Sequence, residues 1–129
     1  MTSVRRIAIV DDDPGVLRAL GRLLRAAEFE VESFSSGADF LLMKGDQQLD
    51  CILLDLHMPG TSGFDVQAEL AQRGVNIPIV VITGDDAPGA RERSLALGAG
   101  SYLCKPIDET ALLATIDSVT RPDQSNLRS

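Results

Sequence analysis

The chain has 129 residues, of which 44% are hydrophobic and 24% charged, and 19 acidic against 12 basic residues give a net charge of −7. This length and composition indicate one folded domain with a hydrophobic core. The acidic charge and the absence of tryptophan argue against a surface that binds nucleic acid or anionic lipid by itself. The apolar run after Arg5 and Arg6 ends at Asp11, too early for a signal peptide or a membrane span, which indicates a cytoplasmic protein.

Short apolar runs alternate with segments of helical periodicity along the chain. In chain order, we predict a strand at 5–10, a helix from 14 to about 27, a strand at 29–34, a helix from 36 to about 44, a strand at 51–56, a helix at 64–72, a strand at 77–82, a loop and helix within 85–97, a strand at 102–104 and a helix from 108 to about 119. Five strands alternating with five helices predict an α/β domain, a doubly wound parallel sheet covered on both faces. This domain spans residues 1–120, and residues 121–129 are expected to be a flexible tail or linker stub.

Polar side chains stand where four of the predicted strands end, which is where ligands bind in such folds. They are Asp11, Asp12, Asp13, Asp55, Thr83 and Lys105. Asp13 precedes Pro14 and is explained as a helix cap. The carboxylates of Asp11, Asp12 and Asp55 would repel one another unless a hard divalent cation such as Mg²⁺ neutralised them. Lys105 can reach a carboxylate or a phosphoryl group as a compact positive charge, and the proline that follows it allows either peptide-bond isomer.

The chain resembles the receiver domain of bacterial two-component response regulators over about residues 5–119. Four segments carry the resemblance: Ile9-Val-Asp-Asp-Asp-Pro14, Leu53-Leu-Asp-Leu-His-Met-Pro-Gly60, Ile82-Thr-Gly84 and Tyr102-Leu-Cys-Lys-Pro106. All four occur in the family's order and at its spacing. The resemblance implies a flavodoxin-like fold with strand order 2-1-3-4-5.

The resemblance also implies a site for phosphoryl transfer. Asp55 would accept a phosphoryl group from a sensor histidine kinase. Asp11 and Asp12 would hold Mg²⁺, with Asp55 and the backbone carbonyl of His57 completing the protein ligands. Lys105 would pair with a phosphoryl oxygen. In phosphoryl transfer the protein mainly positions groups and neutralises charge, which fits this division of roles.

A switch follows from the same resemblance. Thr83 would close onto the phosphoryl group, and Tyr102 would turn inward when Thr83 moves. His57 and Asp85, two positions after Asp55 and Thr83, would tune the lifetime of the phosphoryl group. The face formed by the fourth helix, the fifth strand and the fifth helix is the expected surface for a homodimer or an effector.

The two cysteines are expected to be small buried hydrophobic residues. In the strand order that the resemblance implies, the fourth strand separates Cys51 from Cys104, so we expect no disulfide between them.

The leading hypothesis is a signalling switch that catalyses only its own phosphorylation and dephosphorylation, and is therefore not an enzyme in the usual sense. A haloacid-dehalogenase-type phosphatase would need a second aspartate where His57 stands. A flavin or nucleotide binder would need a glycine-rich loop after the first strand, where the chain has Asp11-Asp-Asp-Pro14. The intact set of site residues argues against a degenerate receiver that is only a scaffold. A further alternative is a stand-alone receiver that acts as a phosphate sink or protein-interaction regulator, although Thr83-Gly84 and the proline-containing tail resemble receivers that precede a DNA-binding domain.

Overall fold

The computed structural model of the protein describes residues 4–43, 48–84 and 86–120. Within these ranges the elements are β1 (Arg6–Val10), α1 (Pro14–Ala26), β2 (Glu30–Phe34), α2 (Gly37–Leu41), β3 (Cys51–Asp55), α3 (Gly63–Gln72), β4 (Ile79–Thr83), α4 (Ala90–Ala96), β5 (Ser101–Cys104) and α5 (Glu109–Thr120). All strand pairs are parallel, and the sheet order is β2-β1-β3-β4-β5. The predicted fold class and strand order are therefore confirmed. The predicted tail at 121–129 lies outside the described residues.

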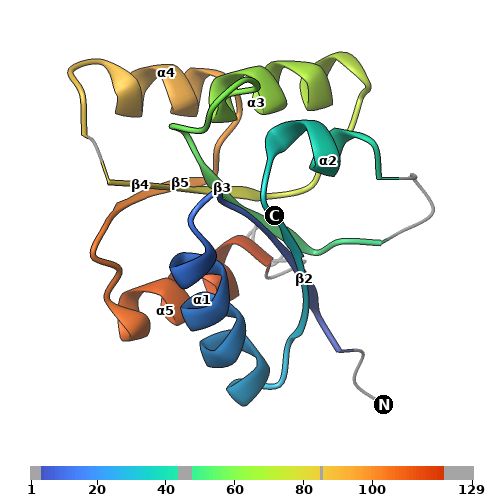
Figure 1. Cartoon of the computed structure of the whole chain (residues 1–129), viewed down its shortest axis with the longest axis vertical. Helices are drawn as coiled ribbons and strands as arrows, with labels where there is room; N and C mark the ends of the chain where they lie inside the picture. The colour runs from blue at the N-terminus through green and yellow to red at the C-terminus, as the bar shows by residue number, and fades with distance from the viewer. Residues whose placement is uncertain (1–3, 44–47, 85, 121–129) are drawn as a thin grey trace, which may run out of the picture.

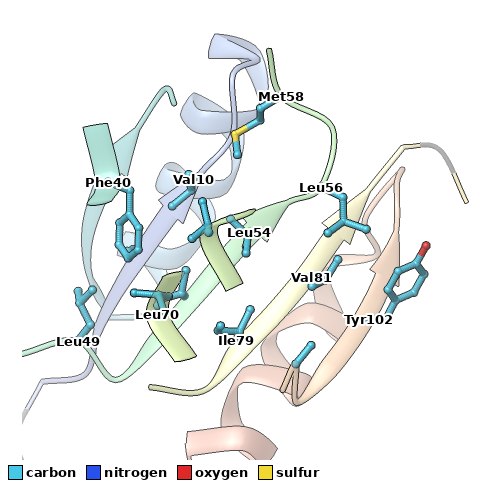
Figure 2. Packing of buried hydrophobic residues seen from close by; sticks show 14 of the residues in the cluster. Val10, Phe40, Leu49, Leu54, Leu56, Met58, Leu70, Ile79, Val81 and Tyr102 are labelled. Atoms are coloured by element: carbon cyan, nitrogen blue, oxygen red, sulfur yellow. The ribbon is translucent and has the colours of Figure 1, made fainter. Parts of the chain in front are cut away.

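Helices cover both faces of the sheet (Figure 1), with α1 and α5 on one face and α2, α3 and α4 on the other. Each helical layer packs on its own apolar cluster, and Figure 2 shows the cluster under α2, α3 and α4. The central strands β3 and β4 are buried along their whole length, as expected of parallel strands with helices on both sides. Their carboxyl ends therefore emerge from a rigid core at one edge of the sheet.

Two helices begin at local caps directly after the strands that end in acidic residues. Asp13 caps α1 by accepting a hydrogen bond from the backbone NH of Gly15 at 2.8 Å, with Pro14 as the first helical residue, as predicted. At α3, Ser62 and Asp65 form a reciprocal capping box, with side-chain-to-backbone distances of 3.0 and 3.2 Å. These caps fix where the chain turns back beside the strand ends.

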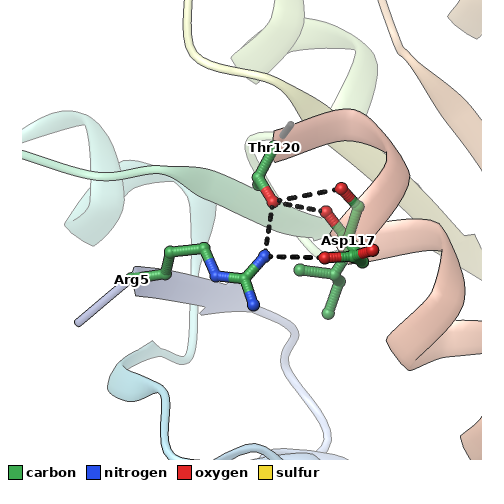
Figure 3. A network of polar contacts seen from close by, with 4 residues as sticks. Arg5, Asp117 and Thr120 are labelled. Carbon is green, nitrogen blue, oxygen red and sulfur yellow. Dashed lines mark hydrogen bonds and ion pairs between the residues drawn. The ribbon is translucent and has the colours of Figure 1, made fainter. Parts of the chain in front are cut away.

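The far end of α5 is joined to the beginning of β1 (Figure 3). The Arg5 guanidinium donates to the Asp117 carboxylate at 3.2 Å and to the Thr120 hydroxyl at 3.0 Å, and it lies 4.8 Å from the centre of the Phe29 ring. The ion pair is substantially exposed, so it orients the helix more than it stabilises the fold. In the described part of the chain, no helix is long and apolar enough to cross a membrane.

Candidate functional site

The structure brings Asp11, Asp12 and Asp55 together at the carboxyl edge of the sheet. One carboxylate oxygen from each residue lies within 4.8 Å of the others. Asp11 follows β1 and Asp55 ends β3, and these strands are hydrogen-bonded neighbours. Asp11 and Asp55 are buried, at 0% and 4% exposure, whereas Asp12 faces solvent. The convergence predicted from the strand ends is thus present in the folded chain.

Burial and the crowding of negative charge perturb Asp55. Burial, followed by the neighbouring charge of Asp11, raises the pKa of the Asp55 carboxyl from 3.8 to about 6, although Lys105 opposes this change. The backbone NH of His57 lies 3.4 Å from an Asp55 carboxylate oxygen. A carboxylate whose charge is only partly compensated, at the mouth of a cleft, is typical of a functional site.

Lys105 closes the other side of the cluster. Its ammonium lies 2.9 Å from the Asp11 carboxylate, and this bond comes from a residue 94 positions away in the chain. Burial lowers the pKa of Lys105, but its hydrogen bond to Asp11 and the surrounding carboxylates outweigh burial and raise it. Lys105 therefore stays charged, and the peptide bond between it and Pro106 is cis.

The residues present fit a magnesium ion. One ammonium against three carboxylates leaves two negative charges, which matches a divalent cation. All the side-chain donors are oxygens, the ligands that Mg²⁺ prefers, and a site built from few carboxylates leaves positions for water and phosphoryl oxygens. The three carboxylates and Lys105 line a common cleft of about 510 Å³ together with Asp13, His57 and Gly84.

Thr83 and His57 flank this cluster from different elements. Thr83 is the last residue of β4 and is fully buried. The strand register pairs Asp55 with Ile82, so Thr83 lies one residue further along the strand beside Asp55. His57 is exposed in the loop after β3, with its backbone directed at the cluster. Asp85, the other residue predicted to tune the site, lies outside the described residues.

Gly63 packs against the backbone of Asp55 and Leu56, and this role was not predicted from the sequence. Its backbone NH donates to the Leu56 carbonyl at 3.0 Å. A side chain at this position would overlap the carbonyl oxygen of Asp55 and lie 2.7 Å from the Leu56 Cα. Only glycine allows the first turn of α3 to pack this closely against the end of β3. The sequence signal available was a glycine just after the turn residues, which by itself indicates no such contact.

Tyr102 lies in β5 beside Val81 of β4, at the edge of the cluster drawn in Figure 2. Its side chain is buried, at 7% exposure, and its hydroxyl donates to the Asp86 carboxylate at 2.8 Å. The resemblance implied that this ring turns inward when Thr83 moves, and in this structure it is already inward. Asp86 was not singled out from the sequence, because nothing in the local pattern pairs it with a residue 16 positions away.

Tyr102 is the only tyrosine in a chain without tryptophan, so its titration can be followed directly by tyrosinate absorbance. Burial, then the hydrogen bond to Asp86, raises the pKa of its hydroxyl to about 12. We expect Asp86→Asn to lower this pKa while leaving it above the ordinary value of about 10, since burial remains. Asp39→Asn, which changes an exposed carboxylate on α2, should leave the titration unchanged. If Tyr102 titrated in Asp86→Asn as it does in the wild type, the hydrogen bond to Asp86 would not contribute to its raised pKa.

One prediction about the cysteines is wrong. Both are free, and Cys51 is buried as expected, with the pKa of its thiol raised by burial to about 12. Cys104, however, is exposed. It is the last residue of β5, an edge strand with no strand beyond it, so the helices do not cover it as they cover β3.

Comparison with known proteins agrees with this geometry. Residues 7–117 match the family model described as the response regulator receiver domain. The response regulator protein TmoT of Ectopseudomonas mendocina is 41% identical over 110 residues, covering 85% of this chain and 50% of that protein. Nodulation protein W of Bradyrhizobium diazoefficiens is 34% identical over 118 residues, covering 92% of this chain and 52% of that protein. The chain thus spans about half the length of these relatives.

A solved structure extends the comparison to three dimensions. A response regulator receiver protein from Burkholderia phymatum superposes with a TM-score of 0.79 and 38% identity, covering 90% of this chain and 94% of that one. The likeness therefore extends from the sequence to the overall fold of nearly the whole of both chains. On these grounds the chain belongs to the family of response regulator receiver domains.

Proposed function

We propose that the protein is a phosphorylation-controlled switch in which Asp55 accepts a phosphoryl group from a sensor histidine kinase. One observation carries the proposal: three carboxylates and one ammonium converge at the end of β3, with Asp55 among them. Family membership supports it, since response regulators act with histidine kinases in two-component systems. Asp55 is the buried carboxylate of the set that ends a central strand and opens into the cleft.

Each residue of the site has a physical task in this reaction. The Asp55 carboxylate is the nucleophile, and its rigid position at the end of β3 orients it for in-line attack. Lys105 neutralises charge on the phosphoryl oxygens, and the Thr83 hydroxyl donates a hydrogen bond to one of them. Asp11, Asp12, Asp55 and the backbone carbonyl of His57 would hold Mg²⁺, which supplies charge neutralisation at the phosphoryl oxygens.

The added phosphoryl charge of about −1.5 to −2 provides the driving force for a conformational change. We infer that Thr83 moves toward Asp55. The Tyr102 side chain then changes its position, because Thr83 and Tyr102 lie on neighbouring strands. The surface of α4, β5 and α5 then presents the change to a second copy or to an effector. The proposed location is the cytoplasm, where a kinase has access to ATP.

The test uses purified protein, Mg²⁺ and a small-molecule phosphodonor such as acetyl phosphate. We expect one phosphoryl group per chain, stable in acid and labile in base, which are the properties of an acyl phosphate. Intact-mass measurement after each treatment gives the stoichiometry and the stability. Rapid hydrolysis of many phosphate esters would instead favour an enzyme, and a chain that remains unmodified would contradict the proposal.

Mg²⁺ binding provides a second prediction. Asp12 is exposed and Asp11 is buried against Lys105, so removing the Asp12 carboxylate deletes a ligand without opening the core. We expect Asp12→Ala to weaken Mg²⁺ binding roughly tenfold or more, measured by titration calorimetry. Asp13→Asn keeps the α1 cap and removes a nearby charge without removing a predicted ligand, so it is the matched control, for which we expect a smaller loss. Equal Mg²⁺ affinity in Asp12→Ala and the control would mean that Asp12 is not a ligand.

A second candidate role is that of a receiver without a DNA-binding output. A stand-alone receiver could act as a phosphate sink or bind another protein, and the relatives' greater length favours a receiver joined to further domains. Phosphorylation of a phosphate sink would not change its self-association or partner binding, whereas phosphorylation of a receiver that regulates a partner or a further domain would. Sedimentation of the unmodified and phosphorylated protein distinguishes a phosphorylation-dependent homodimer from a monomeric sink.

A further inference from the structure

Helix α4 rests on the sheet through small side chains and is held at its flanks by polar and aromatic contacts. Its buried side chains are those of Ala90 and Ser94. On its other faces, the Arg91 guanidinium lies 5.7 Å from the centre of the Tyr102 ring, and that of Arg93 lies 4.0 Å from the centre of the Phe64 ring. A helix that buries so little apolar surface shifts at a lower cost than one anchored by large side chains.

A buried hydrogen bond connects α4 to α3, which lies beside it on the same face of the sheet (Figure 1). Gln67 of α3 is 1% exposed, and its side-chain amide nitrogen donates to the backbone carbonyl of Ser94 at 2.9 Å. The Ser94 hydroxyl, also fully buried, donates to the Arg91 carbonyl within its own helix at 3.0 Å. A buried polar side chain of α3 thus bonds the backbone of α4 at a residue whose own side chain is also polar and buried.

The buried side-chain oxygen of Gln67, Oε1, has no hydrogen-bond donor among the described residues. A buried acceptor without a partner is costly, and leucine would fill a similar volume without that cost. In this structure Gln67 therefore makes only part of the hydrogen bonds that its amide allows. Ser94, whose backbone carbonyl already binds the same amide group, also carries a hydroxyl donor, which at present is directed at the Arg91 carbonyl.

Gln67 is also linked to the proposed phosphorylation site. It stands one helical turn after Gly63, on the same face of α3. Gly63 packs against the backbone of Asp55 and donates to the Leu56 carbonyl at 3.0 Å. A displacement of the Asp55 backbone is therefore transmitted to α3, because no side chain at Gly63 separates the two segments.

We propose that Gln67 is a positioning residue that couples Asp55 to α4 through two alternative arrangements with Ser94. In the arrangement seen here, the Gln67 amide nitrogen binds the Ser94 carbonyl and the Ser94 hydroxyl binds the Arg91 carbonyl. In the other, the Ser94 hydroxyl donates to Gln67 Oε1, and this arrangement accompanies a loaded Asp55. The inference rests on the proposed function of Asp55. It adds a route through α3 to the one through Thr83 and Tyr102.

The test measures the affinity of the protein for beryllofluoride with Mg²⁺, a mimic of the phosphoryl group, by titration calorimetry. Coupling is reciprocal, so a variant that cannot reach the second arrangement must bind the mimic more weakly. We expect Gln67→Leu and Ser94→Ala each to lose roughly 2- to 10-fold in affinity, the equivalent of one hydrogen bond. The double variant should lose no more than either single one. Gln72→Leu, the same change at an exposed position of α3, is the matched control.

Two further measurements separate coupling from structural support. Gln67→Leu should unfold at the same or higher denaturant concentration than the unmodified wild type, because the unsatisfied oxygen is gone. Hydrogen exchange of the α4 amides should change on loading in the wild type and not in the variants. If Gln67→Leu fails to fold, Ser94→Ala still tests the coupling, since it keeps the backbone carbonyl that Gln67 binds.

The outcomes are distinguishable. Wild-type affinity and wild-type exchange changes in both variants would overturn the coupling and leave the function of Asp55 intact. A wild-type protein that binds no beryllofluoride would overturn the proposed function, and the coupling with it.

Discussion

Asp55→Asn is expected to abolish phosphorylation completely and, at the same time, to stabilise the metal-free protein. The amide is not a nucleophile, so no phosphoryl group should appear on incubation with acetyl phosphate and Mg²⁺. The gain in stability follows from the pKa of the Asp55 carboxyl, which burial and Asp11 raise from 3.8 to about 6. A raised pKa means that the folded state disfavours the charged form, at a cost of up to about 3 kcal/mol near pH 7. A neutral side chain of the same shape removes that cost.

The pH dependence gives this prediction a sign that can be checked. Folding favours the protonated Asp55 carboxyl, so its unfavourable contribution develops as pH rises from 3.8 to about 6 and is complete above that range. Urea unfolding in the presence of a chelator should therefore show Asp55→Asn more stable than wild type at pH 7. The difference should shrink as pH falls through 6 and vanish near 3.8.

The control is the carboxylate in the same acidic run whose side chain caps α1. Asp13→Asn keeps the helix cap, because asparagine caps as well as aspartate, and it should phosphorylate like the wild type. Equal phosphorylation of Asp55→Asn and wild type would assign the acceptor to another residue. A stability difference that does not vary with pH would mean that the Asp55 carboxyl is not strained by burial in the folded state.

The sequence predicted the fold well where one physical signal dominated. The apolar runs of β1, β3 and β4 are strands with helices on both faces, and such strands have no other satisfactory environment. Boundaries were less accurate where the pattern was weak. Helix α2 was expected to reach about residue 44 and ends at Leu41, with Leu42 as its C-cap and largely exposed. A five-residue helix offers too few turns for periodicity to define its end.

The site was predictable as far as topology alone could place it. Parallel strands bring their carboxyl ends to one edge, so Asp11 and Asp55, which follow or end neighbouring strands, had to lie near one another once the strands were known. Lys105 follows β5 at the same edge, with β3 and β4 between it and β1, and its long side chain reaches Asp11. Contacts between side chains from separate helices and loops carried no such signal. The hydrogen bonds of Tyr102 to Asp86 and of Gln67 to the Ser94 carbonyl depend on how α4 and the loop before it lie on the sheet, which no local pattern specifies.

Gly63→Ala is expected to be the most damaging single-methyl change near the site. The added carbon would overlap the Asp55 carbonyl oxygen and lie 2.7 Å from the Leu56 Cα, and both are backbone atoms that cannot swing aside. Either α3 moves away from β3 or the Asp55 backbone is displaced. We expect a loss of about 3 kcal/mol in the free energy of unfolding, measured by urea denaturation, since overpacking a rigid site costs this much. The remaining folded protein should accept phosphoryl groups from acetyl phosphate at least tenfold more slowly, because a displaced nucleophile loses its alignment.

The same substitution elsewhere in the chain isolates the cause. Gly21 lies inside α1, where an added carbon would meet only the flexible end of the Arg25 side chain, at 3.1 Å. Alanine favours the helix there by about 1 kcal/mol, so Gly21→Ala should be neutral or stabilising and should phosphorylate normally. If Gly63→Ala lowers the free energy of unfolding and Gly21→Ala does not, the loss is due to the backbone contact of residue 63 with Asp55. If both variants were equally stable and equally active, α3 could not be packed rigidly against the acceptor, and the coupling proposed through Gln67 would lose its mechanical link to Asp55.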